Sequence, residues 1–313
     1  MADNVHIVFG SFPISHLPTE EVSKILPLLK QYGVNEWDTA RIYPDSESTI
    51  GNLGITNEIV IDTKIRGFED GCLSRESILE SATQSLKELK VESVNILYFH
   101  SPDKITAIEE SVDAINELYK QGKFKKFGLS NFTVEDVKKV YEYSKKNNYV
   151  LPSVFQGNYN AFSRGVEKEL FPLLRKYNMS FFAYSPIAGG FLVKTTKQVE
   201  EGQGRFDTTS FIGQMYNKMY NRPSLMKGLE KWGEIAEENK LSKAHMAFRW
   251  IAYHSELSKN HGDGLIFGGR NYEQFKDTLT ALKDGPLSAK VAAEIEEIWK
   301  SIENEAPLNN LVY

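Results

Sequence analysis

Eight short apolar runs recur along this chain, and helix-like stretches separate most of them. This alternation, at a spacing of roughly 30 residues, is typical of successive βα units in a parallel barrel. It predicts a (β/α)8 TIM barrel, in which the carboxyl ends of all strands meet at one mouth. The length of 313 residues suits one such barrel, so we expect a single domain over 1–313. The runs span 5–9, 34–38, 58–63, 94–99, 124–129, 153–156, 179–184 and 263–267.

Helix signals fill most of the intervals between these runs. Ser74 and Thr133 each stand where an N-cap side chain would begin a helix. One interval departs from this regular alternation. The segment at about 187–222 is long and is rich in glycine and aromatic residues. A connection of this length is usually functional or disordered, and at a barrel mouth we expect a long lid loop. The expected helices span 19–32, 46–53, 74–89, 104–121, 133–147, 165–177, 223–239, 242–254, 271–282 and 288–303, the last ones being extra C-terminal helices.

Composition restricts the partners and the compartment. The net charge is -5 and no long basic run occurs, which argues against nucleic acid and anionic membranes as partners. No apolar stretch approaches the roughly 20 residues of a membrane span. Cys72 is the single cysteine, and the N-terminus lacks the pattern of a secretory signal. We expect a cytoplasmic protein that acts on a small molecule, with a homodimer left open and no metal.

Four polar residues follow the second, third and fourth runs. Asp38 and Tyr43 lie after one run, and Lys64 and His100 after the next two. At one barrel mouth, Tyr43 could donate a proton to the oxygen of a carbonyl being reduced. A nearby Lys64 ammonium would lower the pKa of the phenol, Asp38 would hold Lys64, and His100 would orient the carbonyl. Alternatively, each residue is satisfied locally at its own strand end.

The hydride for such a reduction must come from a cofactor, because no protein side chain supplies one. No G-x-G-x-x-G follows the first run, so a Rossmann site is unsupported. Ser130, Asn131 and Gln156 end or follow later runs and offer groups suited to a carboxamide. Tyr184 offers a ring face for stacking. After the last run, Gly268 to Arg270 open a helix, where backbone N–H groups and a guanidinium could bind a phosphate.

Nearly the whole chain, about 5 to 310, resembles the aldo-keto reductases, and most closely their aflatoxin-aldehyde and succinic-semialdehyde reductase branch. The similar stretches include D-T-A-R-I-Y, V-N-I-L-Y-F-H-S-P-D, F-G-L-S-N-F and F-F-A-Y-S-P-I-A-G-G-F-L. The resemblance implies NADPH-dependent reduction of aldehydes and ketones, with NADP+ as the product. It also implies that Tyr43 is the proton donor, that Lys64 and Asp38 support it, and that His100 contacts the substrate.

The resemblance further implies the binding residues. The implied cofactor-binding residues are Asp38, Ser130, Asn131, Gln156, Tyr184, Ser185, Pro186, Ile187, Gly189, Gly190, Phe191, Leu192, Lys194, Arg205, Gly268, Gly269, Arg270, Gln274 and Thr278. The implied substrate residues are Phe12, Tyr43, His100, Tyr216, Met219 and Tyr220. In this assignment Arg205 is a second clamp on the cofactor, and Arg270 is best placed for a 2′-phosphate.

Two departures from the branch concern binding. Met219 stands where the branch has an arginine that reads a substrate carboxylate, and Thr278 replaces a residue that usually faces adenine. We therefore expect neutral, medium-sized aldehydes to be favoured over carboxylated ones. A second hypothesis is a regulatory or binding protein on the same barrel, like a potassium-channel β subunit, because such proteins keep the four polar residues.

Overall fold

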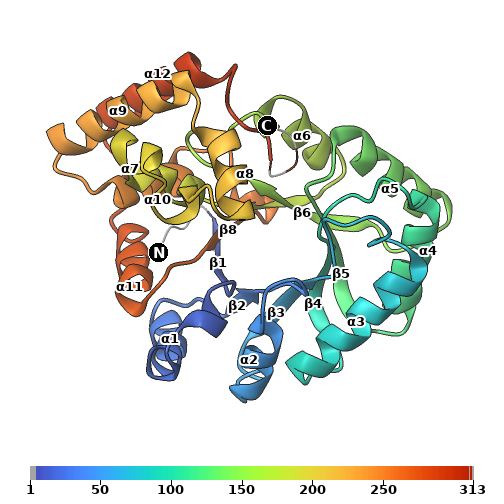
Figure 1. The fold of residues 1–313 in the computed structure, drawn as a ribbon. Coiled ribbons are helices and arrows are strands. Elements are labelled where there is room, and N and C mark those ends of the chain that lie inside the picture. The colour runs from blue at the N-terminus through green and yellow to red at the C-terminus, as the bar shows by residue number, and fades with distance from the viewer. Residues whose placement is uncertain (1–4, 310, 312–313) are drawn as a thin grey trace.

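A computed structural model describes residues 5–309 and 311, so residues 1–4, 310, 312 and 313 of the predicted domain lie outside the described residues. Eight parallel strands form a closed barrel in chain order, each paired with its neighbours in sequence and β1 with β8 (Figure 1). The (β/α)8 prediction is confirmed. The strands are β1 (His6–Gly10), β2 (Glu36–Asp38), β3 (Val60–Lys64), β4 (Val94–Phe99), β5 (Phe124–Ser130), β6 (Pro152–Asn158), β7 (Ser180–Tyr184) and β8 (Gly264–Phe267).

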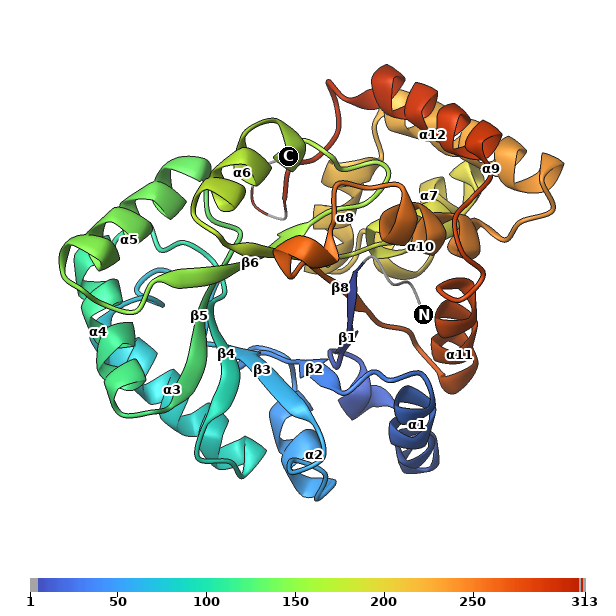
Figure 2. The same ribbon diagram turned by 180° about the vertical axis from the view of Figure 1, so that it is seen from behind.

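Helices surround this barrel on the outside, and α9 and α12 lie side by side away from it (Figures 1 and 2). The α-helices are α1 (Thr19–Gln31), α2 (Ser46–Asn52), α3 (Arg75–Leu89), α4 (Ile108–Lys120), α5 (Val134–Lys146), α6 (Val166–Lys176), α7 (Thr196–Glu200), α8 (Phe211–Tyr220), α9 (Pro223–Glu238), α10 (Lys243–Tyr253), α11 (Tyr272–Ala281) and α12 (Ala289–Ile302). Short 3-10 helices are η1 (Ile14–His16), η2 (Ala188–Val193), η3 (Gly204–Phe206) and η4 (Lys259–His261). Among the described residues, no helix is long and apolar enough to cross a membrane.

Local signals explain where some helices begin. Ser74 Oγ accepts the Ser77 N–H at 3.3 Å before α3, and Thr133 Oγ1 accepts the Asp136 N–H at 3.1 Å before α5. Both predicted N-caps are therefore present. Helix α4 was expected from residue 104 but begins at Ile108. The Asp103 carboxylate organises the preceding loop instead, because it accepts hydrogen bonds from this loop and from the backbone before α3.

The barrel interior is apolar over most of its circumference. Its packed side chains include Val8, Ile96, Tyr98, Val154, Phe182 and Ile266. Gly128 is the register partner of Tyr98, and a Cβ there would lie 2.2 Å from Cδ1 of the Tyr98 ring. The glycine thus leaves the room that the ring fills. Strands β2 and β3 are the exception, since buried charged residues interrupt their apolar pattern.

The segment 187–222 is folded into short helices. It contains η2, α7, η3 and α8, so most of the predicted lid loop is helical. Phe191, Phe206, Met219 and Tyr220 are buried in the main apolar core. The aromatic residues that distinguish this segment in the sequence therefore anchor it to the protein.

Candidate active site

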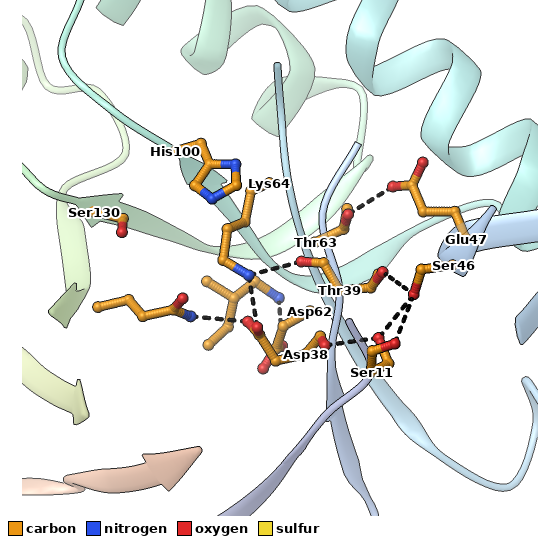
Figure 3. Close-up of polar contacts among 12 residues, drawn as sticks. Ser11, Asp38, Thr39, Ser46, Glu47, Asp62, Thr63, Lys64, His100 and Ser130 are labelled. Carbon is orange, nitrogen blue, oxygen red and sulfur yellow. Dashed lines mark hydrogen bonds and ion pairs between the residues drawn. The ribbon is translucent and has the colours of Figure 1, made fainter. Parts of the chain in front are cut away.

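An ion pair between Lys64 and Asp38 lies at the carboxyl ends of β2 and β3. Lys64 Nζ donates to Asp38 Oδ2 at 2.6 Å and to the backbone oxygen of Thr39 at 2.7 Å (Figure 3). Gln156 Nε2 donates to the other carboxylate oxygen, Asp38 Oδ1, at 2.8 Å. The Lys64 and Asp38 side chains are 0% and 4% exposed. A buried ammonium is therefore held in place by a hydrogen-bonded group that spans β2, β3 and β6.

Tyr43 lies over this pair. The centroid of its ring is 5.2 Å from Lys64 Nζ and 5.9 Å from the centroid of the His100 ring. Phe12 also packs edge-to-face against the Tyr43 ring, at 5.0 Å between centroids. The structure thus brings together the four polar residues that the sequence placed after three separate strands.

Burial and charge act in opposite directions on the pKa of Tyr43. Burial raises the pKa of the phenol, and the Lys64 charge opposes this rise, with a smaller contribution from Arg205. The net direction is upward, because burial outweighs the effect of the Lys64 charge. The contribution of Lys64 nevertheless has the expected sign, and it makes the phenol more acidic than burial alone would.

Burial also shifts the pKa values of Lys64, Asp38 and His100. Burial lowers the pKa of Lys64, but the charges of Asp38 and Tyr43 outweigh it and hold this pKa above its usual value. Burial raises the pKa of Asp38, against the opposing effect of Lys64. Burial and the Lys64 charge together hold the pKa of His100 well below its usual value. The site therefore contains a charged lysine beside a neutral imidazole at neutral pH.

A group of amides and hydroxyls adjoins the four residues. Asn131, which has a φ of +64°, donates from Nδ2 to the backbone oxygen of His100 at 3.0 Å and to Ser130 Oγ at 3.1 Å. Tyr184 OH donates to Asn131 Oδ1 at 2.8 Å. Ser130, Asn131 and Tyr184, expected from three places in the sequence, are thus joined in one hydrogen-bonded network.

Residues 185–190, which follow β7 and are called the strap below, have an unusual backbone. Ser185, Ala188, Gly189 and Gly190 all have positive φ. A Cβ at Gly189 would lie 1.9 Å from Cε1 of Tyr216, so only glycine fits against α8. Among the other residues expected at the cofactor, Phe191 and Leu192 are fully buried and Thr278 is nearly so.

Two cations meet beside the glycine of η3. A Cβ at Gly204 would lie 2.9 Å from Arg270 Nη2 and 3.6 Å from Lys194 Nζ. Burial and the Arg270 charge lower the pKa of Lys194. Neither cation forms an ion pair with a carboxylate in the described part of the chain. Gln274 Oε1 accepts the backbone N–H of Arg270 at 2.8 Å and fixes the turn after β8. This arrangement is suited to an anion such as a phosphate.

Arg205, the middle residue of η3, contacts two of the proposed substrate residues. Its guanidinium carbon is 5.7 Å from the ring centroids of both Phe12 and Tyr216, and Nη1 donates to Tyr216 OH at 3.2 Å. The structure therefore places Arg205 against Phe12 and Tyr216, whereas Lys194 and Arg270 form the separate cation pair.

The remaining proposed substrate residues are held in the core. Met219 and Tyr220 are 1% and 0% exposed, and Tyr220 OH accepts hydrogen bonds from Asn158 and Asn160. Of the neighbouring cations, Lys218 is exposed, and Arg222 donates to the backbone oxygens of Lys218 and Glu305.

Sequence reasoning missed Phe68, which adjoins His100. The two ring centroids are 5.0 Å apart, and Phe68 is 44% exposed. Its φ of +66° is unusual for a bulky residue, and Ser101 Oγ holds it by accepting the Phe68 N–H at 2.7 Å. The signal in the sequence is the preceding Gly67, where a Cβ would lie 2.8 Å from that of His100.

Comparisons with known proteins identify the family of the chain. The model of the aldo/keto reductase family matches residues 6–300. The oxidoreductase sirO of Leptosphaeria maculans is 36% identical over 294 residues, covering 93% of this chain and 89% of that protein. The human aldo-keto reductase family 7 member A3 is 34% identical over 291 residues, covering 88% and 87%. Human aflatoxin B1 aldehyde reductase member 2 is 34% identical over 291 residues, covering 88% and 80%. The chain therefore belongs to the aldo/keto reductase family and is an oxidoreductase enzyme.

Proposed function

We propose that the protein reduces aldehydes, and some ketones, to alcohols with NADPH. The observation that supports this best is the Lys64–Asp38 ion pair beside Tyr43 and His100. It combines a proton donor, a buried cation and a neutral imidazole, which are the groups that a carbonyl needs as it accepts a hydride. The relatives that carry the name aflatoxin B1 aldehyde reductase support aldehydes as the substrate class.

In the proposed mechanism the neutral His100 side chain donates a hydrogen bond to the carbonyl oxygen and orients it. Tyr43 then gives its phenolic proton to that oxygen as negative charge develops there. Lys64 remains charged and stabilises the phenolate that this transfer leaves on Tyr43. Asp38 and the Thr39 carbonyl hold the ammonium in place throughout. When bound, the nicotinamide supplies the hydride.

The residues present fit a phosphorylated dinucleotide. Lys194 and Arg270 converge beside Gly204 without a carboxylate partner in the described structure, which leaves both charges for an anion. We assign Arg270 to the 2′-phosphate that distinguishes NADPH from NADH. The hydrogen-bonded Ser130, Asn131 and Tyr184 would hold the nicotinamide end, with Gln156 beside Asp38.

For the substrate we propose neutral, medium-sized aldehydes over carboxylated ones. Met219 cannot pair with a carboxylate, and its side chain is buried. The aromatic rings of Phe12 and Phe68, which flank Tyr43 and His100, favour an apolar body on the aldehyde. A single barrel domain over 1–313 and a cytoplasmic location remain predictions from the sequence.

The test is oxidation of NADPH by the purified protein with neutral aliphatic, aromatic and carboxylated aldehydes. We expect turnover that Tyr43→Phe abolishes, and higher kcat/KM for the neutral compounds. NADH serves as the matched cofactor control. Absence of turnover with every aldehyde, while NADPH still binds tightly, would favour the alternative of a binding protein on this barrel.

A further inference from the structure

Two further buried carboxyl groups, those of Asp62 and Glu36, lie inside the barrel near Lys64. We call the four site residues Asp38, Tyr43, Lys64 and His100 the tetrad. Asp62 is two residues before Lys64 on β3, so both side chains leave the strand on the same face. Asp62 is also the register partner of Asp38 on β2. Glu36 lies two residues before Asp38 and shares its face. Figure 3 shows Asp62 next to Asp38, close to the ammonium of Lys64.

The two oxygens of Asp62 have different surroundings. Oδ1 accepts the Asn95 Nδ2 donor at 2.9 Å and the Ile96 N–H at 3.1 Å. Oδ2 is buried and receives no hydrogen bond within the described residues. The whole residue is 0% exposed, so bulk solvent does not reach this oxygen. An ionised Asp62 would thus carry its charge on an oxygen with no partner, which is costly.

Within the described residues, no cation forms an ion pair with Asp62. Lys64 directs Nζ to Asp38 and to the carbonyl of Thr39. The titratable groups that act most strongly on Asp62 from the neighbouring strand are Glu36 and Asp38, both acidic. Like charges directly opposite each other on paired strands are destabilising, the more so when buried. A proton on one of these groups removes the conflict.

Glu36 lies diagonally opposite Asp62 on β2, because Glu36 pairs in register with Val60 and Asp38 pairs with Asp62. Its Oε2 lies 2.8 Å from His6 Nε2, and the His6 side chain is 41% exposed. Burial pushes the pKa of Glu36 upward, but hydrogen bonds from His6 and Asp62, with the charges of His6 and Lys126, hold it below its usual value. Burial and the Glu36 charge hold the pKa of Asp62 well above its usual value. The proton therefore belongs to Asp62.

We infer that Asp62 keeps its proton at neutral pH, shares it with Glu36, and acts as a positioning residue for the tetrad. When Asp62 is neutral, it does not compete with Asp38 and Tyr43 for the positive charge of Lys64. An ionised Asp62 places a further negative charge beside Asp38 and opposes the negative charge that develops on Tyr43. The catalytic part of this inference rests on the proposed function, whereas the shared proton does not.

The size of the effect follows from the spacing. Residues two apart in a strand lie about 7 Å apart, and charges at that separation in a protein interior interact strongly enough to change a rate about tenfold or more. Loss of the Asp62 proton should therefore slow reduction roughly tenfold at alkaline pH. Tyr98 on β4 faces the same space; its OH has no partner in the described structure, and burial holds its pKa well above the usual value.

The first experiment compares the thermal stability of Asp62→Asn with that of the wild type between pH 4 and pH 9. In the unfolded chain Asp62 ionises near pH 4, whereas in the folded chain it keeps its proton to higher pH. The wild type therefore loses stability through this residue as pH rises, whereas the asparagine of the variant does not titrate. We expect the two Tm values to converge near pH 4 and the variant to be more stable by at least ~2 °C at pH 8. Asp113→Asn, on the exposed face of α4, is the matched control and should show no such divergence.

The second experiment measures kcat for aldehyde reduction over the same pH range. Glu36→Gln removes the negative charge that helps Asp62 hold its proton, so its alkaline loss of rate should begin at lower pH than in the wild type. In Asp62→Asn this loss should be delayed or absent. If the Tm values of Asp62→Asn and the wild type change in parallel with pH, the inference that Asp62 keeps a proton shared with Glu36 is overturned. Diverging Tm curves with unchanged kcat profiles in both variants would overturn the positioning role alone. A wild type without NADPH turnover would overturn the proposed function and leave the stability test intact.

Discussion

Replacing Lys64 by methionine tests the electrostatics of the site most directly. The substitution removes an ammonium that is 0% exposed and leaves the Asp38 carboxylate buried with Gln156 as its remaining side-chain partner. Removing one partner of a buried ion pair costs about 3–5 kcal/mol, because the other charge is left unpaired. We expect a loss of that size in the free energy of unfolding at pH 7.5.

The loss should depend on pH in a defined direction. Burial already raises the pKa of Asp38, and without Lys64 nothing of comparable size opposes it. Asp38 will then be neutral in the folded variant at pH values where it is ionised in the unfolded chain, which is above about pH 4. The deficit should therefore be small at pH 4.5 and grow as pH rises to 7.5. Urea denaturation at both pH values measures it.

The double variant Asp38→Asn with Lys64→Met is the control, since it removes both charges. Its deficit should be smaller than that of the single variant and nearly independent of pH. In kinetics, Lys64→Met should lower kcat by about 10²-fold or more and move the limb of the pH profile that belongs to Tyr43 to higher pH. An equal loss of stability at both pH values, or an unchanged pH profile, would refute the proposed coupling of these residues.

Three further outcomes are expected. Tyr43→Phe should lower kcat by about 10²–10⁴-fold while the Kd for NADPH stays nearly constant, and retention of more than about a tenth of the wild-type kcat would exclude Tyr43 as the acid. Arg270→Ala should reduce the preference for NADPH over NADH by roughly ten- to a hundredfold, mainly through Kd, because a charge-assisted hydrogen bond is worth about 1.5–3 kcal/mol. Equal use of both cofactors by the wild type would contradict that role. Neutral aldehydes should have higher kcat/KM than succinic semialdehyde. The opposite result would refute this preference and make Arg205, which contacts Phe12 and Tyr216, the first cation to test as a carboxylate-binding residue.

The strands and the order of the tetrad could be predicted because both depend on local sequence. An apolar run followed by a polar residue marks the end of a buried strand, and the barrel then brings Asp38, Lys64 and His100 to one mouth. The observed β4 coincides with its predicted range, and the other strands differ by a few residues at their ends. Helix caps at Ser74 and Thr133 are local in the same way.

Properties that depend on packing could not be predicted from the sequence. The net pKa of Tyr43 reflects how far burial outweighs the Lys64 charge, and only the folded chain sets that balance. Met219 was expected at the substrate, but α8 turns its side chain into the core. Phe68 contacts His100 because Gly67 allows its loop to approach, a contact between two different βα units. The helical character of 187–222 likewise depends on aromatic anchors from distant parts of the chain.

The contact between Gly189 and Tyr216 has a kinetic consequence. It fastens the strap after β7 to α8, and Arg205 also donates to the same tyrosine. If the dinucleotide lies beneath this strap, it can enter or leave only after the contact has opened, a motion that typically takes microseconds to milliseconds. The observed rate constant for NADPH association should then reach a plateau at high NADPH concentration, at the rate of opening. Tyr216→Ala should raise that plateau and shorten the residence time of NADP+.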